Sequence, residues 1–148
     1  MPSPSLVLQI VVAVFLLLET ANVAALYFAP GSAHFNAVGV FCGWTDSASD
    51  PDLHSFVRYL VYWVAGTKLI FIALWLVILV VGEPRTQLLA SAVMVPAVAT
   101  FYWRLFPLVR RLDSRGKVQP RGYSTVLGVM IAGFIGAFAV AAAIAFWT

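Results

Sequence analysis

Glu19 and Lys68 are opposite charges set within apolar sequence, where ionised side chains are rare. Glu19 lies near the middle of the apolar stretch Leu6–Ala29, and Lys68 lies near the middle of Tyr59–Val81. An ionised side chain at the centre of a bilayer costs roughly 2.5 to 3.5 kcal/mol on insertion scales. Helices built from the two stretches run antiparallel and carry their charges at matching depth. We therefore expect Glu19 and Lys68 to form an intramembrane ion pair.

Three kinds of chemistry fit such a pair. The favoured one is structural, because buried charges are generally paired and a neutral pair fixes the register between two helices. The alternatives are a proton or ion relay, and contact with a polar group of a ligand or partner subunit. Asn22 follows Glu19 by three residues, so the first helix has a polar face that must turn toward protein rather than lipid.

The composition indicates the elements that must position this pair. The chain has 148 residues, of which 62% are hydrophobic and 10% charged, whereas about 25% of a soluble domain is charged. Helices of about 20 apolar residues cross a bilayer. The sequence predicts an all-α integral membrane protein, with four transmembrane helices in one bundle and a single domain over residues 1–148. The expected helices span about residues 5–29, 51–82, 84–112 and 121–147.

The connection between the first two helices is the longest non-spanning segment. Its part from His34 to Trp44 is too apolar for a solvated loop and too short to span, so we expect a short interfacial or re-entrant piece. Asp50 and Pro51 then form a helix start, with Asp50 as the N-cap. Pro96 and Pro107 predict kinks in the third helix.

The fourth apolar stretch carries small residues spaced by three or four positions. Small residues in register let helix backbones approach closely, and packing drives helix association in lipid. This pattern predicts a helix-packing face, for which a partner helix within the chain is favoured over one from a neighbouring chain. The face consists of Gly128, Ala132, Gly136, Ala139 and Ala143.

Basic residues gather around the connection between the third and fourth helices. Positive charge in short loops marks the cytoplasmic side, so we expect loop 109–121 to be cytoplasmic and both termini to lie outside. The mixture of aromatic and basic residues is typical of a membrane-interface belt and not of a nucleic-acid site. These residues are expected to contact anionic lipid headgroups or a partner. They are Arg104, Arg110, Arg111, Arg115, Lys117 and Arg121.

Catalytic, cofactor and metal signatures are not recognisable in the sequence. The two histidines, His34 and His54, lie outside the apolar cores, which argues against haem ligation inside the bundle. Cys42 is the single cysteine, which excludes an intramolecular disulfide and a multi-cysteine metal site. We therefore expect no catalytic residue, no cofactor and no metal.

These observations favour a non-enzymatic, multi-pass membrane subunit. Its expected role is to pack with and stabilise other transmembrane chains, or copies of itself, in a larger membrane complex, surrounded by lipids that are anionic at the cytoplasmic face. The alternative is a small oligomeric transporter or channel that uses the pair of Glu19 and Lys68. A third interpretation is an interfacial lipid enzyme that uses His54 and Arg58.

Overall fold

The described part of the chain, residues 4–147 of the computed structural model, is built from helices. Within these described residues, four helical segments are long and apolar enough to cross a membrane, namely Leu6–Phe28, Pro51–Val81, Pro84–Ser114 and Tyr123–Trp147. The helices in chain order are α1 (Pro4–Phe28), the 3₁₀ helix η1 (Val38–Val40), α2 (Cys42–Ser47), α3 (Pro51–Val81), α4 (Pro84–Ala99), α5 (Phe101–Ser114) and α6 (Tyr123–Trp147).

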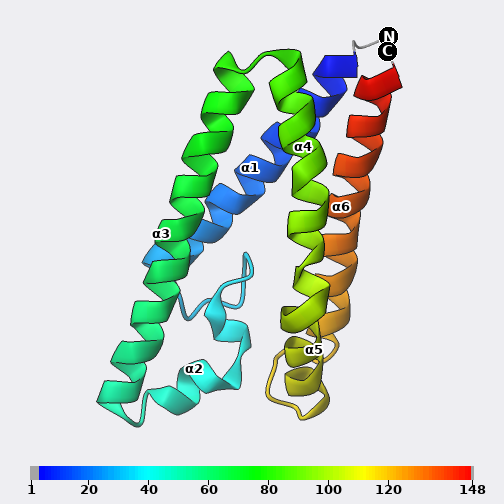
Figure 1. Ribbon diagram of the computed structural model, residues 1–148. Coiled ribbons are helices and arrows are strands. Elements are labelled where there is room, and N and C mark those ends of the chain that lie inside the picture. The colour runs from blue at the N-terminus through cyan, green and yellow to red at the C-terminus, as the bar shows by residue number, and fades with distance from the viewer. Residues whose placement is uncertain (1–3, 148) are drawn as a thin grey trace.

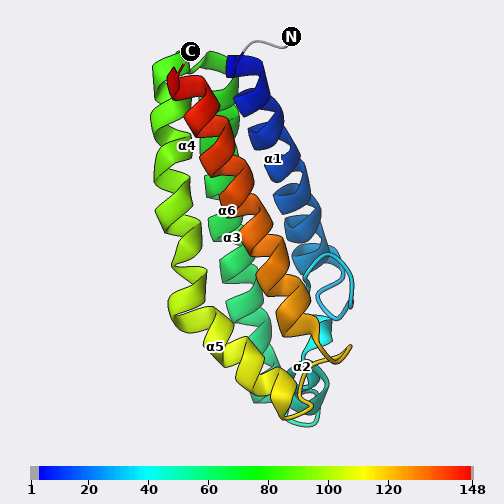
Figure 2. The ribbon, with the colours of Figure 1, turned by 90° about the vertical axis from the view of Figure 1, so that its right-hand side faces the viewer.

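The long helices lie side by side in an order that differs from their order in the chain. Helix α1 packs along both α3 and α6, and α4 packs along α6. Helices α3 and α4 meet at their hairpin and diverge away from it, as Figure 1 shows. The view in Figure 2 shows α6 crossing in front of α3 and between α1 and α4. Helix α1 therefore lies between two neighbours, as its polar face requires.

Aromatic side chains fill the centre of the protein. The ring of Phe15 on α1 meets Phe71 of α3 and both Phe134 and Phe138 of α6 edge-on, with centroid distances of 6.1, 5.1 and 5.3 Å. Trp75 of α3 lies 6.3 Å from the ring of Phe138. Such edge-to-face contacts contribute about 0.5–1.5 kcal/mol each beyond burial of their area. This cluster joins α1, α3 and α6.

The start of α3 follows directly from its sequence. The Oδ1 atom of Asp50 accepts hydrogen bonds from the backbone N–H groups of Asp52 and Leu53, both at 3.1 Å, and Pro51 occupies the first helical position. The predicted N-cap is confirmed. A cap of this kind satisfies backbone donors that would otherwise lack partners.

The third predicted helix is interrupted. One helix over residues 84–112, kinked at Pro96 and Pro107, was expected; the structure divides it into α4, which ends at Ala99, and α5, which begins at Phe101. Pro96, which has no N–H to donate to the carbonyl of Ala92, lies inside α4 one turn before this break. At the break the N–H of Thr100 is shared between the carbonyls of Pro96 and Ala97, at 3.2 and 3.3 Å. Pro107 likewise lies inside its helix, α5.

The first and third connections lie together at the end of the molecule opposite the α3–α4 hairpin. The N–H of Cys42 donates to the carbonyl of Lys117 at 3.0 Å, and the N–H of Gln119 donates to the carbonyl of Val40 at 2.8 Å. A salt bridge of 3.4 Å joins Lys117 to Asp46. The two connections therefore form one structural unit at that end.

Candidate functional site: a polar network around Glu19 and Lys68

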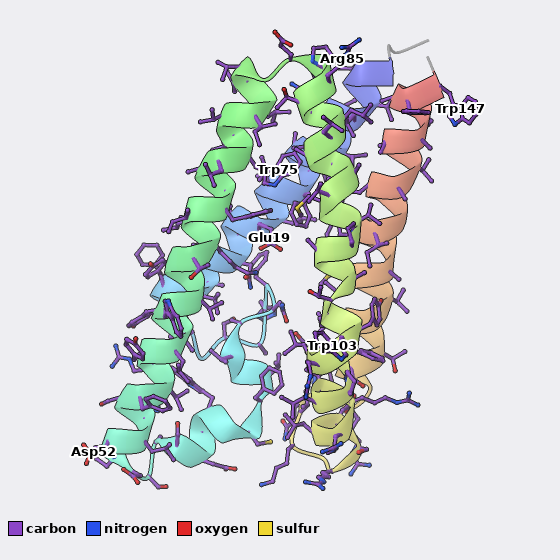
Figure 3. All side chains as sticks on the ribbon, viewed as in Figure 1. Glu19, Asp52, Trp75, Arg85, Trp103 and Trp147 are labelled. Carbon is purple, nitrogen blue, oxygen red and sulfur yellow. The ribbon has the colours of Figure 1, made fainter. Side chains whose placement is uncertain are left out.

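The structure brings the two charges that were predicted to lie within the membrane into direct contact. The Nζ atom of Lys68 lies 2.7 Å from Oε2 of Glu19, which makes a salt bridge between α3 and α1. Figure 3 shows Glu19 roughly midway along the long helices. The pair is partly exposed, with 30% of the Lys68 side chain and 22% of the Glu19 side chain accessible. The rest of the protein therefore covers the Glu19–Lys68 pair only in part.

Asn22 extends the pair into a network. Its Oδ1 accepts a hydrogen bond of 2.6 Å from Lys68 Nζ. Its Nδ2 donates to the backbone carbonyls of Phe35 and Asn36, at 2.5 and 3.1 Å. The side chain is buried, with 6% exposure. Asn22 therefore joins the charged pair to the first connection, because its single amide bonds to polar groups from two other segments.

The connection after α1 turns back along that helix to reach Asn22. Phe35 and Asn36 both have positive φ angles, 54° and 56°. This left-handed conformation is unfavourable for a bulky residue such as Phe, so it persists only where other contacts fix it. The Asn22 amide supplies such contacts. The hydroxyl of Tyr123, at the start of α6, also donates to the Asn36 side chain.

A second buried polar side chain, Gln87, lies near the α3–α4 hairpin. The sequence did not predict it as a site residue. Gln87 of α4 is 5% exposed, and its Nε2 donates to the carbonyls of Ile78, Leu79 and Gly82 at 3.1–3.3 Å. Its Oε1 accepts from Gln9 of α1 at 3.2 Å. Gln87 thus adds a donor to carbonyls at the C-terminal end of α3, of which that of Ile78 also accepts from the N–H of Gly82. A single glutamine in an apolar segment carries no periodic pattern that would signal this role.

His54 and Arg58, the two residues of the enzymatic alternative, contact different side chains. His54 lies with Nδ1 2.9 Å from Ser47 Oγ, and its ring packs 4.7 Å from Trp44. Arg58 donates to the hydroxyl of Tyr62 at 3.0 Å. The contacts of His54 hold α2 against α3, whereas the hydrogen bond of Arg58 lies within α3. Within residues 4–147, no group of three His, Cys, Asp or Glu side chains is placed to hold a metal ion.

The small residues of α6 that were predicted as a packing face are mostly exposed, although α6 itself packs along α4 and α1. Only Gly128 is buried, where an added Cβ would lie 2.7 Å from the Phe106 ring. The other four members, Ala132, Gly136, Ala139 and Ala143, are exposed. Helix α6 instead packs inward through large residues such as Phe134 and Phe138. Spacing identified a uniform face but could not indicate which way it turns.

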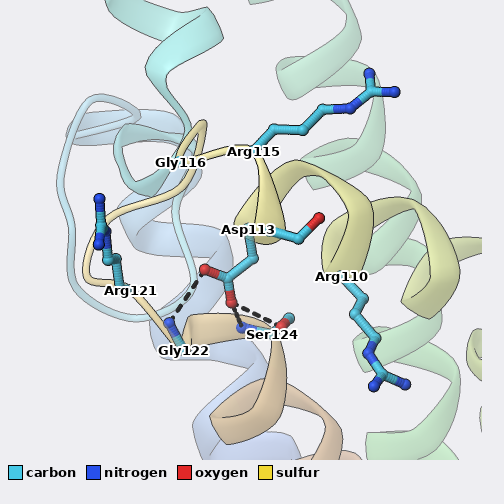
Figure 4. A pocket seen from close by; sticks show the side chains of 8 residues that line it. Arg110, Asp113, Arg115, Gly116, Arg121, Gly122 and Ser124 are labelled. Atoms are coloured by element: carbon cyan, nitrogen blue, oxygen red, sulfur yellow. Dashed lines mark hydrogen bonds between the residues drawn. The ribbon is translucent and has the colours of Figure 1, made fainter.

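The predicted basic residues separate into different environments. Arg104 lies over the ring of Trp103, 5.2 Å from its centroid, Lys117 pairs with Asp46, and Arg111 is exposed. The other three border a pocket of about 550 Å³ between the ends of α5 and α6, shown in Figure 4. They are Arg110, Arg115 and Arg121.

Asp113 is the acidic residue of this pocket, and it is already occupied. Its carboxylate accepts hydrogen bonds from the N–H of Gly122 at 3.1 Å, the N–H of Ser124 at 2.9 Å and the Ser124 hydroxyl at 2.7 Å. A carboxylate at a helix N-terminus is favourable because of the helix dipole. Asp113 therefore joins the end of α5 to the start of α6.

Comparison with known proteins gives no assignment for this chain. No protein-family model, curated protein or solved structure matches it. Function must be argued from the geometry above.

Proposed function

We propose that the protein is a multi-pass membrane subunit that packs against a transmembrane helix of another chain, or of a second copy, through the outer face of α6. The observation that carries this proposal is the exposure of the small residues Ala132, Gly136, Ala139 and Ala143 along α6. An added Cβ at Gly136 meets nothing within 4 Å. A neighbouring backbone therefore has room to approach closely.

The outer face of α3 gives a useful contrast. It presents large apolar side chains, including Trp63, Ile70 and Leu74, which are 63%, 66% and 60% exposed. Large side chains suit contact with lipid tails, whereas a row of small residues favours close helix packing. The row of small residues, which lies beside the exposed Val129 and Val140 on α6, supports a protein partner there, and the outer face of α3 suits lipid.

The charged pair fits the same proposal as an internal support. Glu19 and Lys68 neutralise each other between α1 and α3, and Asn22 adds hydrogen bonds from the first connection. The helices around them can then present α6 on a stable frame. We further propose that the end with the two joined connections is cytoplasmic, because Arg110, Arg115 and Lys117 lie there.

A specific observation also favours a second candidate, a small transporter or channel. The Glu19 and Lys68 side chains keep 22% and 30% of their surface accessible, so the pair is open to a ligand or to water. In this case flux measured in vesicles should disappear in Glu19→Gln while the fold persists. If flux is the same for Glu19→Gln and the unmodified protein, the pair does not line a transport path.

Purification from native membranes in mild detergent tests the leading proposal. We expect the tagged protein to elute with a defined partner chain, or as a dimer or larger oligomer, by mass measurement. Gly136→Leu should release the partner, because the larger side chain holds the two backbones apart. Ala73→Leu, at an exposed small residue on α3, is the matched control and should keep it. A monodisperse monomer from the unmodified protein would contradict the proposal.

A further inference from the structure

The pocket between α5 and α6 has an excess of positive charge that the chain itself does not neutralise. Asp113 directs its carboxylate to the start of α6, where three donors hold it. Among the described residues, the side chains of Arg110, Arg115 and Arg121 form no salt bridge, and each is exposed. Three guanidinium groups therefore border one pocket of about 550 Å³ without an acidic partner.

An apolar groove adjoins this pocket. A second cavity of about 400 Å³ is lined by Phe106, Pro107 and Arg111, and it shares Arg110 and Ser114 with the first. Phe106 and Pro107 lie about one helical turn before Arg110 on α5, toward the break with α4. A cationic pocket and an apolar groove thus meet at the same two residues.

The surroundings of α5 place both cavities beside the region where a membrane surface would lie. Trp103, Leu105 and Leu108 are 74%, 52% and 51% exposed. They lie on the same short helix as the exposed Arg104 and Arg111. Helices that mix exposed tryptophan, leucine and arginine lie at the depth of lipid headgroups.

We propose that this site binds one anionic phospholipid, with the phosphate among Arg110, Arg115 and Arg121 and an acyl chain along the groove at Phe106 and Pro107. The guanidinium fork matches phosphate oxygens with paired hydrogen bonds. In Figure 4 the three arginines extend in different directions around Asp113, so a bound phosphate would draw these long side chains together. This proposal rests on the membrane insertion proposed above and is independent of the α6 partner.

Native mass spectrometry of the full chain in neutral detergent tests the site. The probes are phosphatidylglycerol, phosphatidylcholine with the same acyl chains, and glycerol phosphate. We expect phosphatidylglycerol to bind at least tenfold more tightly than either of the others, because only it combines a net negative headgroup with acyl chains. Equal binding of glycerol phosphate would identify a soluble phosphate ligand, and equal binding of phosphatidylcholine would remove the role of charge. Either result overturns the proposal.

Matched charge variants locate the binding. The double variant Arg110→Gln with Arg121→Gln should weaken phosphatidylglycerol binding at least tenfold. The control double variant Arg58→Gln with Arg85→Gln removes two exposed positive charges elsewhere and should change binding less than threefold. Equal effects of the two double variants, or a smaller effect of the first, would overturn the assignment. Unchanged thermal unfolding of both variants establishes that folding is preserved.

A variant that keeps every charge tests the junction of the two cavities. Ser114→Trp fills the place where pocket and groove meet. It should weaken phosphatidylglycerol binding at least fivefold, and undiminished binding would place the lipid elsewhere. Capture of the α6 partner should be unaffected by these variants, so failure of the lipid proposal is distinguishable from failure of the packing proposal.

Discussion

The amine of Lys68 lies 2.7 Å from the carboxylate of Glu19, so α3 and α1 are joined by an ion pair halfway along their length. Such a pair stabilises the protein only while both charges are present. Removing one partner leaves a charge in an apolar environment, whereas removing both does not.

The first prediction concerns this pair. Lys68→Ala should lower thermal stability more than the double variant Glu19→Gln with Lys68→Met. Breaking a buried pair costs about 3 to 5 kcal/mol, and replacing both partners is often near neutral. The partial exposure of both side chains reduces the absolute values but keeps the ranking. The purified variants can be compared by thermal unfolding. A harmless Lys68→Ala would mean that Glu19 has another partner.

The second prediction concerns Asn22. Asn22→Leu should remove the hydrogen bonds to Phe35 and Asn36 and lower stability by about 1–3 kcal/mol. Loss of these bonds should also release the left-handed turn, so amide hydrogen exchange should rise in residues 33–38. Thr20→Leu is the control, because Thr20 is exposed and bonds only within α1. Unchanged exchange at Phe35 and Asn36 in Asn22→Leu would show that other contacts hold the turn.

The third prediction concerns Gln87 at the α3–α4 hairpin. Gln87→Glu should destabilise more than Gln87→Leu, because it places a carboxylate against the carbonyls of Ile78, Leu79 and Gly82. Leaving buried acceptors unsatisfied costs about 1–3 kcal/mol, and more where a charge is buried. Thermal unfolding at neutral pH gives the ranking. Equal stability of Gln87→Glu and the unmodified protein would exclude these hydrogen bonds as a source of stability.

Some of these relationships were readable from the sequence. Glu19 and Lys68 were paired from charge and depth alone, since two opposite charges in apolar helices have few other solutions. Asp50 and Pro51 gave the start of α3, because capping depends on adjacent residues. Helix capping, which depends on adjacent residues, and the pairing of opposite charges in apolar helices can therefore be predicted from the sequence alone.

Other relationships depend on the arrangement in space. Asn22 was placed on the polar face of α1, but its contact with Phe35 and Asn36 depends on a turn of the chain that no pattern encodes. The outward direction of the α6 small residues depends on which face the aromatic cluster around Phe15 selects. Gln87 and Asp113 form hydrogen bonds to backbone groups of other segments. Composition and residue spacing do not predict such contacts.

The fourth prediction concerns orientation. In a Cys42→Ala background, a membrane-impermeant thiol reagent added to intact cells should label Glu83→Cys at the hairpin and leave Ser114→Cys unlabelled. The reason is the concentration of arginine around Ser114, at the end opposite the hairpin. Permeabilised cells provide the control, since both cysteines are exposed and should then react. Labelling of Ser114→Cys alone in intact cells would reverse the proposed orientation.

Photo-crosslinking in native membranes tests the central claim most directly. A benzophenone side chain replaces Ala132 on the outer face of α6 or, as control, Leu74 on the outer face of α3; both positions are exposed. The account predicts a discrete adduct of higher mass from position 132, containing another transmembrane chain or a second copy, and none from position 74. The absence of an adduct at position 132, or the same adducts from both positions, would contradict it.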